Sequence, residues 1–369
     1  MASFLERGYT KKRICHRRHR LCILCLSWGN NLFVRVFDVC CQSFIAWGLR
    51  DAFSWLYLGR VFVNKGGDVV KSKESKMGER DAGELVSFVA DDQQALVGHF
   101  FAAAPEVSKK QAILFATGTG IPQYVYFACA SWLAKQGFDA LTFDFRGIGE
   151  TLAGERVKGS TIRKQDWGEL DLPAAYRYLY ERTQKDVILM GHSAGGQLVG
   201  LMPQAPQLYA IVQIAGSSGY LKRLSGWLKW NALFSMNIMM PLTSRLFGYV
   251  PMKTFGWGED LPSGVALQWA EWCRTPGYVE TSFGKDIPRH YYDEIRCPVL
   301  NVSAVDDAIA TEHNIDDILR LFPCAKVDRL RPAPEDYGWK SIGHSGFFSR
   351  QKQPLWEEVL RWLVALEER

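Results

Sequence analysis

The feature that most constrains the fold is a short apolar segment that leads directly into a glycine-flanked serine. Residues 186–190 (DVILM) precede Gly191–Gly196, whose sequence is GHSAGG, with Ser193 near its centre. Residues 195–202 are predicted to begin a helix, so Ser193 would lie on a strand-to-helix turn. At the carboxyl end of a parallel strand, small neighbouring residues let such a turn adopt a strained conformation. The pattern predicts a serine hydroxyl that faces the amino end of a helix.

Strand-like and helix-like segments alternate on both sides of this turn. An opening hairpin is predicted at residues 85–101. Further strands are predicted at 111–116, 140–145, 209–214, 298–302 and 326–330, and helices at 122–136, 166–182, 312–321 and 354–366. Near-continuous apolar strands separated by helices are typical of a mostly parallel sheet that is covered on both faces. The sequence therefore predicts an α/β fold.

The alternation stops between about residues 217 and 296. This stretch is rich in large apolar side chains, namely Trp227, Trp230, Phe234, Met239, Met240, Phe247, Trp257, Trp269 and Trp272. We predict a helical cap at 217–296, inserted between two parts of an α/β core at 84–216 and 297–369. The aromatic residues would either line an apolar acyl or aromatic pocket or pack as the core of the cap itself.

The amino-terminal extension, residues 1–76, differs in charge from the rest of the chain. It holds 14 Lys and Arg against 5 Asp and Glu, whereas the remaining residues hold 30 against 34. The body is therefore mildly acidic, which argues against a nucleic-acid surface. Met77 stands just before the core-like segment, so we expect the extension to be a poorly ordered leader or an over-extended reading frame.

No stretch of the extension or the body has the roughly 20 mostly uncharged residues that a membrane span needs. The short apolar run after the basic residues 11–20 suggests a signal peptide only weakly, because no clean cleavage site follows. The chain has nine cysteines without regular spacing in the body, which favours a reducing compartment and a cytoplasmic location. No cofactor or metal is expected, because no convincing ligand cluster occurs in the body. The oligomeric state is left open.

A serine hydroxyl attacks an acyl carbon only with a base to take its proton and an acid to orient that base. On a turn of this kind the chain order is serine, acid, histidine. Of the seven histidines, four precede Ser193. His290 precedes the strand expected to carry the acid, and His313 lies at the start of a helix soon after that strand. His344 lies in a glycine-flanked loop after the last predicted strand, so we expect it to be the base.

Two adjacent aspartates compete for the third role. Asp306 and Asp307 both follow the predicted strand that ends near Val302. We favour Asp307, because the apolar residue two positions later would fold the loop back onto the core. Asp306 would then be a solvated or helix-capping carboxylate.

The developing oxyanion needs two backbone N–H donors. We expect one from Ala194, at the start of the helix after Ser193. The second is expected from the loop after strand 111–116, where Thr119 is favoured and Gly118 gives the backbone room. Thr117 and Gly120 remain alternatives.

Four motifs together resemble the α/β-hydrolase superfamily, and more narrowly its serine aminopeptidase- and monoacylglycerol-lipase-like bacterial branch. They are the FDFRGIG turn at 143–149, the GHSAGG turn at 191–196, the DDAIA loop at 306–310 and GHSGFF at 343–348. The resemblance covers about residues 84–368 and implies a fold, a triad and acyl-transfer chemistry. It departs where the His-Gly pair common in the oxyanion loop is replaced by Thr117 and Gly118. One fold hosts many activities, so no substrate follows from it.

The expected function is hydrolysis of an ester or a related acyl bond of a small molecule, by a triad of Ser193, His344 and Asp307. An acyltransferase uses the same machinery and is not distinguishable by sequence. An aminopeptidase would need a cap carboxylate near the pocket, for which Glu259, Asp260, Glu271 and Glu280 are the candidates. A non-catalytic binding protein is the remaining alternative, and it would be favoured if the triad residues lay far apart in the folded chain.

Overall fold

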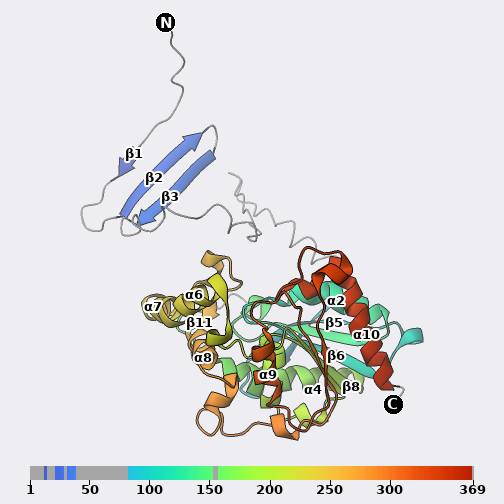
Figure 1. Ribbon diagram of the computed structural model, residues 1–369. Helices are drawn as coiled ribbons and strands as arrows, with labels where there is room; N and C mark the ends of the chain where they lie inside the picture. Colours follow the sequence, from blue (N-terminus) through green and yellow to red (C-terminus); the bar gives the residue numbers. More distant parts are fainter. Residues whose placement is uncertain (1–11, 15–20, 29–30, 39–81, 153–156, 368–369) are drawn as a thin grey trace. The chain divides into compact units, whose positions relative to one another are not determined.

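The computed structural model describes the backbone of residues 12–14, 21–28 and 31–38, and the full residues 82–152 and 157–367 (Figure 1). The chain divides into two units, residues 1–59 and 60–369. In the first, strands β1 (Lys12–Ile14), β2 (Leu21–Trp28) and β3 (Asn31–Asp38) form an antiparallel sheet in that order. The rest of the extension predicted at residues 1–76 lies outside the described residues.

The second unit is built on one eight-stranded sheet. Its strands are β4 (Glu84–Val89), β5 (Ala95–Phe101), β6 (Gln111–Ala116), β7 (Asp139–Phe143), β8 (Asp186–His192), β9 (Ala210–Ile214), β12 (Val299–Val302) and β13 (Val327–Leu330). Their order across the sheet is β13-β12-β9-β8-β6-β7-β5-β4. Every neighbouring pair from β13 to β7 is parallel, and β5 pairs antiparallel with both β7 and β4. The predicted mostly parallel sheet is confirmed.

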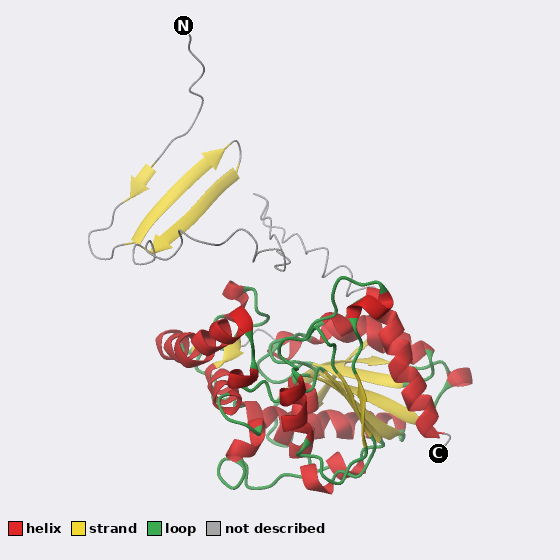
Figure 2. Ribbon diagram, viewed as in Figure 1, coloured by secondary structure: helices red, strands yellow, loops and turns green. Residues whose placement is uncertain are grey.

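Helices cover both faces of this sheet (Figure 2). They are α2 (Phe127–Lys135), α3 (Lys164–Asp166), α4 (Leu172–Thr183), α5 (Ala194–Gln197), α9 (Glu312–Leu319) and α10 (Gln353–Glu367). Successive side chains of a strand point to opposite faces. In β6, accordingly, Ile113 and Phe115 pack in the apolar cluster with α2 and α10, whereas Ala112 and Leu114 pack in the cluster with α4 and α9. All six residues of β6 are buried, as expected for a central parallel strand.

A π-helical turn occurs in the helix predicted at 166–182 and another in the predicted helical cap. One turn spans Trp167–Asp171 just before α4, and the other spans Ser235–Met239 in the cap. Each is followed two residues later by a proline, Pro173 or Pro241. Because proline has no N–H to donate, the regular hydrogen-bond ladder is interrupted there, and the backbone closes the wider turn instead.

Residues 217–296, predicted to be a cap and called the cap below, are mainly helical. They contain α6 (Gly226–Phe234), α7 (Met240–Phe247) and α8 (Ser263–Cys273), which lie together beside the sheet in Figure 1. A short antiparallel pair, β10 (Tyr249–Val250) and β11 (Leu261–Pro262), joins α7 to α8. Within the described residues, no helix reaches the length and apolar character needed to cross a membrane.

Candidate active site

Ser193 lies on a strained turn between β8 and α5. Its backbone has φ 48° and ψ −109°, a conformation that a residue with a side chain rarely adopts. The flanking glycines are required by close packing. A Cβ on Gly191 would lie 2.3 Å from Gly196 N, and one on Gly195 would lie 2.1 Å from the backbone oxygen of Ala116. The small residues of the motif therefore let α5 pack directly on the sheet.

His344 and Asp307 are brought together by two different loops. His344 Nδ1 lies 2.8 Å from Asp307 Oδ2, in the geometry of an N–H donor and a carboxylate acceptor. The Asp307 side chain is fully buried, and burial opposes its charge. The contact with His344 and two backbone N–H groups outweigh this cost and lower the pKa of Asp307. Asp307 thus stays ionised and orients the imidazole so that Nε2 is left to accept a proton.

Asp306 has a different place from the one expected. Its side chain is neither simply solvated nor a helix cap. Its two carboxylate oxygens accept the backbone N–H groups of Ile342 and Gly343, both at 2.9 Å. These are the two residues immediately before His344. Asp306 therefore holds the histidine loop, while Asp307 contacts the histidine ring itself.

His192 connects the serine turn to the same loop. This buried ring lies with Nε2 3.0 Å from the backbone oxygen of His344 and with Nδ1 2.8 Å from the hydroxyl of Tyr126. The backbone oxygen of His344 can only accept, so His192 Nε2–H donates to it. Nδ1 of the neutral ring then accepts the Tyr126 hydroxyl proton, while the Tyr126 oxygen accepts the Gly118 N–H at 2.8 Å. Burial and the nearby His344 lower the pKa of His192 to about 3, so the ring is neutral. The sequence pattern predicts no role for His192 or Tyr126.

The chain of contacts through His192 places His344 beside the serine turn, because His192 immediately precedes Ser193. The rings of His192 and His344 have centroids 5.6 Å apart. Ser193 is partly accessible, and no hydrogen bond joins its hydroxyl to another described residue. In enzymes without bound substrate, the hydrogen bond from nucleophile to base is often long and tightens when substrate binds.

Two backbone N–H groups are available for an oxyanion. Ala194 is the first residue of α5, where an N–H has no intrahelical acceptor. In the loop after β6, the N–H of Gly118 is occupied by Tyr126, whereas no described residue accepts the N–H of Thr119. Thr119 therefore stays the favoured loop donor, and Thr117 and Gly120 stay the alternatives.

A buried lysine, which the sequence did not mark, holds the Thr119 side chain. Lys164 Nζ donates to Thr119 Oγ1 at 2.5 Å. The ammonium lies 4.8 Å from the ring centroid of Trp167 and 5.3 Å from that of Trp269, which belongs to α8 of the cap. Lys164 is 0% exposed, and no carboxylate among the described residues pairs with it. Burial lowers the pKa of Lys164 to about 7. A lone lysine near a helix start has no sequence signature that predicts such burial.

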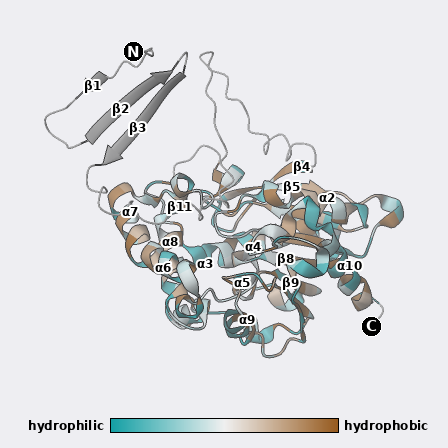
Figure 3. Cartoon of the chain, turned by 45° about the horizontal axis from the view of Figure 1, so that its top comes forward, coloured by the Kyte–Doolittle hydropathy of each residue, from teal (hydrophilic) through white to brown (hydrophobic). Residues whose placement is uncertain are grey.

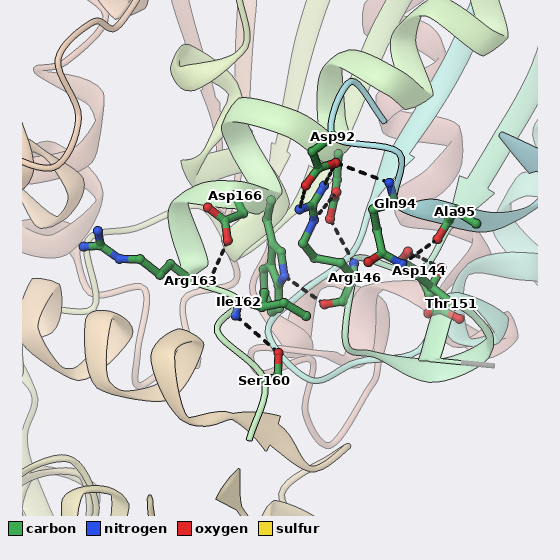
Figure 4. A network of polar contacts seen from close by, with 12 residues as sticks. Asp92, Gln94, Ala95, Asp144, Arg146, Thr151, Ser160, Ile162, Arg163 and Asp166 are labelled. Atoms are coloured by element: carbon green, nitrogen blue, oxygen red, sulfur yellow. Dashed lines mark hydrogen bonds and ion pairs between the residues drawn. The ribbon is translucent and has the colours of Figure 1, made fainter. Parts of the chain in front are cut away.

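The turn at 143–149 is held by a network of polar contacts around Asp144 and Arg146 (Figure 4). Asp144 Oδ1 accepts the N–H of Gln123 at 2.7 Å, and its Oδ2 accepts that of Glu150 at 2.8 Å. A Cβ on Gly149, which has φ +50°, would lie 2.2 Å from Asp144 Oδ2, so this position requires glycine. Asp144 therefore ties the loop that follows β7 to the segment that follows the Thr119 loop.

Arg146, in the same turn, forms a partly buried ion-pair network. Its Nε lies 2.6 Å from Asp171 Oδ1, and its Nη1 lies 2.6 Å from Asp92 Oδ2. Asp171 precedes α4, and Asp92 is in the β4–β5 hairpin. Arg146 thus connects three segments that are far apart in sequence.

The cap meets the Thr119 loop directly. The Glu259 N–H donates to the backbone oxygen of Gly120 at 2.8 Å. Three of the four cap carboxylates considered for an aminopeptidase have other contacts, and the fourth, Glu271, is exposed. Glu259 pairs with Lys253, Asp260 accepts the Lys253 N–H, and Glu280 pairs with Arg320. Among the described residues, no three His, Cys, Asp or Glu side chains gather as a metal ion would need.

Known proteins that resemble this chain share its fold. The model of a family described as the alpha/beta hydrolase family matches residues 113–356. No curated protein sequence matches the chain. DcsB in complex with its substrate analogue is 15% identical over 77% of this chain and 98% of that one, with a TM-score of 0.51. A membrane phospholipase A described as a bacterial virulence factor is 13% identical over 80% of this chain and 90% of that one, with a TM-score of 0.50. A thermophilic esterase from Thermogutta terrifontis is 15% identical over 76% and 98%, with a TM-score of 0.47. At these identities the likeness concerns the fold.

Proposed function

Because the chain belongs to the alpha/beta hydrolase family, we propose that it is a serine hydrolase that cleaves an ester or a related acyl bond with Ser193 as nucleophile. The observation that carries the proposal is the pairing of His344 with the buried Asp307, in a loop that His192 holds next to the strained Ser193 turn. A base oriented by a buried carboxylate beside an accessible serine is the arrangement that nucleophilic acyl transfer needs.

In the proposed reaction, His344 Nε2 takes the hydroxyl proton as Ser193 Oγ attacks the carbonyl carbon. The N–H groups of Ala194 and Thr119 stabilise the oxyanion. When the tetrahedral intermediate collapses, His344 returns the proton to the leaving alcohol, and an acyl-enzyme remains. Water, deprotonated by His344, then attacks the acyl-enzyme, and the acid and free Ser193 are released.

The proposed substrate is a small acyl compound with an apolar or aromatic group. Support comes from the cap, which reaches the Thr119 loop through Glu259 and places Trp269 near Lys164 in the same region. The aminopeptidase alternative gains no support, because Glu280 and Glu259 are paired with other side chains.

The test is hydrolysis of p-nitrophenyl esters of increasing acyl length by the full chain and by Ser193→Ala. A matched control is Ser349→Ala, which changes an exposed serine in the segment after His344. We expect turnover by the wild type and the control, and its loss in Ser193→Ala. Equal turnover in Ser193→Ala would overturn the assignment of the nucleophile. Adding an alcohol acceptor distinguishes acyl transfer, since an ester product would then form at the expense of free acid.

A further inference from the structure

The cap carries an unusual apolar surface on its outer side. The segments α6, η9 (Ser235–Met239) and α7 follow one another without a break. The exposed face of this continuous helical segment is formed mainly by large apolar residues that recur every three or four positions. We call them the outer stripe: Trp227, Trp230, Phe234, Ile238, Leu242 and Leu246. Trp227 is 77% exposed, Trp230 67% and Leu246 64%. In a helix that only covers a core, this face is normally polar.

The outer stripe is not the face that holds the cap together. The inner face is formed in η9 and α7 by Met236, Met239, Met240 and Thr243, all of which are buried, and in α6 by the partly buried Leu228 and Leu233. The helix is therefore apolar on two sides. The inner side is accounted for by packing within the cap, whereas the outer side has no packing role within the described residues. Neither a pocket lining nor a cap core, the two roles expected from sequence, fits Trp227 and Trp230.

The charge around the stripe indicates what it contacts. Between Ser217 and Gly258 there is no Asp or Glu, while Lys222, Arg223, Lys229, Arg245 and Lys253 are all present. Lys253 is paired with Glu259, but Lys222, Arg223 and Arg245 are exposed. The rest of the body is mildly acidic, so this basic character is local. Large apolar and aromatic residues bordered by basic residues are the composition of helices that lie in the surface of an anionic membrane.

We propose that the outer stripe of α6–α7 docks the protein on the surface of a membrane that contains anionic lipid. The helix would lie in the plane of the interface, with the Trp227 and Trp230 rings at the level of the headgroups. Lys222, Arg223 and Arg245 would contact lipid phosphates. This is peripheral attachment, without a membrane span. Figure 3 shows apolar residues, in brown, recurring along α6 and α7.

The test is co-sedimentation of the full chain with vesicles of phosphatidylcholine alone, and with vesicles in which about a third of the lipid is phosphatidylglycerol. One variant combines Trp230→Gln, Ile238→Gln and Leu246→Gln. The matched control combines Leu85→Gln and Val89→Gln on β4, which remove side chains of similar exposure, 64% and 51%, elsewhere on the surface. Because all proteins retain residues 1–76, any difference reports the stripe rather than the basic extension. Thermal unfolding checks that each variant is folded.

We expect the wild type and the control to bind the anionic vesicles, and the stripe variant to bind at least about tenfold more weakly. Lys222→Gln with Arg223→Gln should weaken binding to anionic vesicles only, and added salt should have the same effect. Absence of wild-type binding, or equal binding by the stripe variant, would overturn the proposal. So would a concentration-dependent dimer that the stripe variant abolishes, since a second copy would then cover this surface. None of these results depends on whether Ser193 is catalytic.

Discussion

The Nε2 atom of His192 lies 3.0 Å from the backbone oxygen of His344, so the residue that precedes the serine also holds the histidine loop. Through Tyr126, the same ring is linked to the N–H of Gly118 in the loop that carries Thr119. One buried, neutral imidazole thus connects the three segments that would supply the nucleophile, the base and an oxyanion donor. His192 precedes Ser193 in the chain and so did not qualify as the base, and the sequence predicted no other role for it.

Replacing the His192 ring should reduce turnover because it changes the position of His344, not because His192 itself reacts. We expect His192→Phe to lower kcat roughly ten- to a hundredfold with little change in KM, because the His344 loop loses its anchor. His192→Gln, whose amide N–H is able to donate to the His344 oxygen, should recover part of the loss. Steady-state kinetics on a p-nitrophenyl ester measure both effects. If His192→Phe and wild type had the same kcat, the connection would be irrelevant to activity.

Replacing Asp307 should lower kcat much more than replacing the adjacent Asp306. Asp307→Ala removes the carboxylate on His344 Nδ1, and we expect kcat to fall about a thousandfold or more. Asp306→Ala removes the acceptor of two backbone N–H groups, and we expect a loss of about tenfold, partly restored in Asp306→Asn. The two variants are a matched pair, compared by kcat after their folding is checked by circular dichroism. A larger loss in Asp306→Ala would assign the triad acid to Asp306.

The buried Lys164 should make stability depend on pH. Its pKa is lowered by burial to about 7 in the folded state, from 10.5 as the ordinary value. Between these pH values the unfolded chain binds a proton that the folded chain does not, so the free energy of unfolding rises with pH in this window. Below pH 7 both states are protonated, and the full cost of burying the charge is present.

Lys164→Met removes this cost. We expect the variant to be more stable than the wild type at pH 6, by as much as a few kcal/mol, and the difference to shrink by pH 9. Urea unfolding at both pH values measures it. A difference that grew with pH would mean that the lysine is charged and stabilised in the folded protein.

The two carboxylates on Arg146 should contribute unequally to stability. The Asp171 side chain is 0% exposed, and that of Asp92 is 41% exposed. Removing Asp171 leaves a buried guanidinium partly unpaired, and we expect Asp171→Ala to cost about 3–5 kcal/mol. The exposed pair is screened by water, so Asp92→Ala should cost about 1 kcal/mol or less. Urea denaturation of the two variants tests the order, and equal losses would contradict it.

Sequence predicted those parts of the fold whose physical cause is local. Burial on both faces makes β6 and β8 continuous apolar runs, and the predicted hairpin agrees with β4 and β5. The π-helical turns before Pro173 and Pro241 were not predicted, because apolar residues at helical spacing do not distinguish a π-helical turn from a regular helical turn.

The features that sequence did not predict depend on the tertiary environment. The apolar spacing of α6 and α7 is the same for a buried helix and for one with an exposed stripe, so sequence alone did not distinguish the two for Trp230. Likewise, nothing local marks Lys164 as buried or Asp306 as the acceptor of the N–H groups before His344. Each depends on segments far away in the chain.

The central claim is that Ser193 is an activated nucleophile. Its most direct measurement is labelling of the full chain with a fluorophosphonate, followed by mass spectrometry of the modified peptide. We expect one adduct on Ser193, which is lost in Ser193→Ala and forms much more slowly in His344→Ala, because the base is then absent. Undiminished labelling of Ser193→Ala, or labelling at another serine of the folded protein, would contradict it.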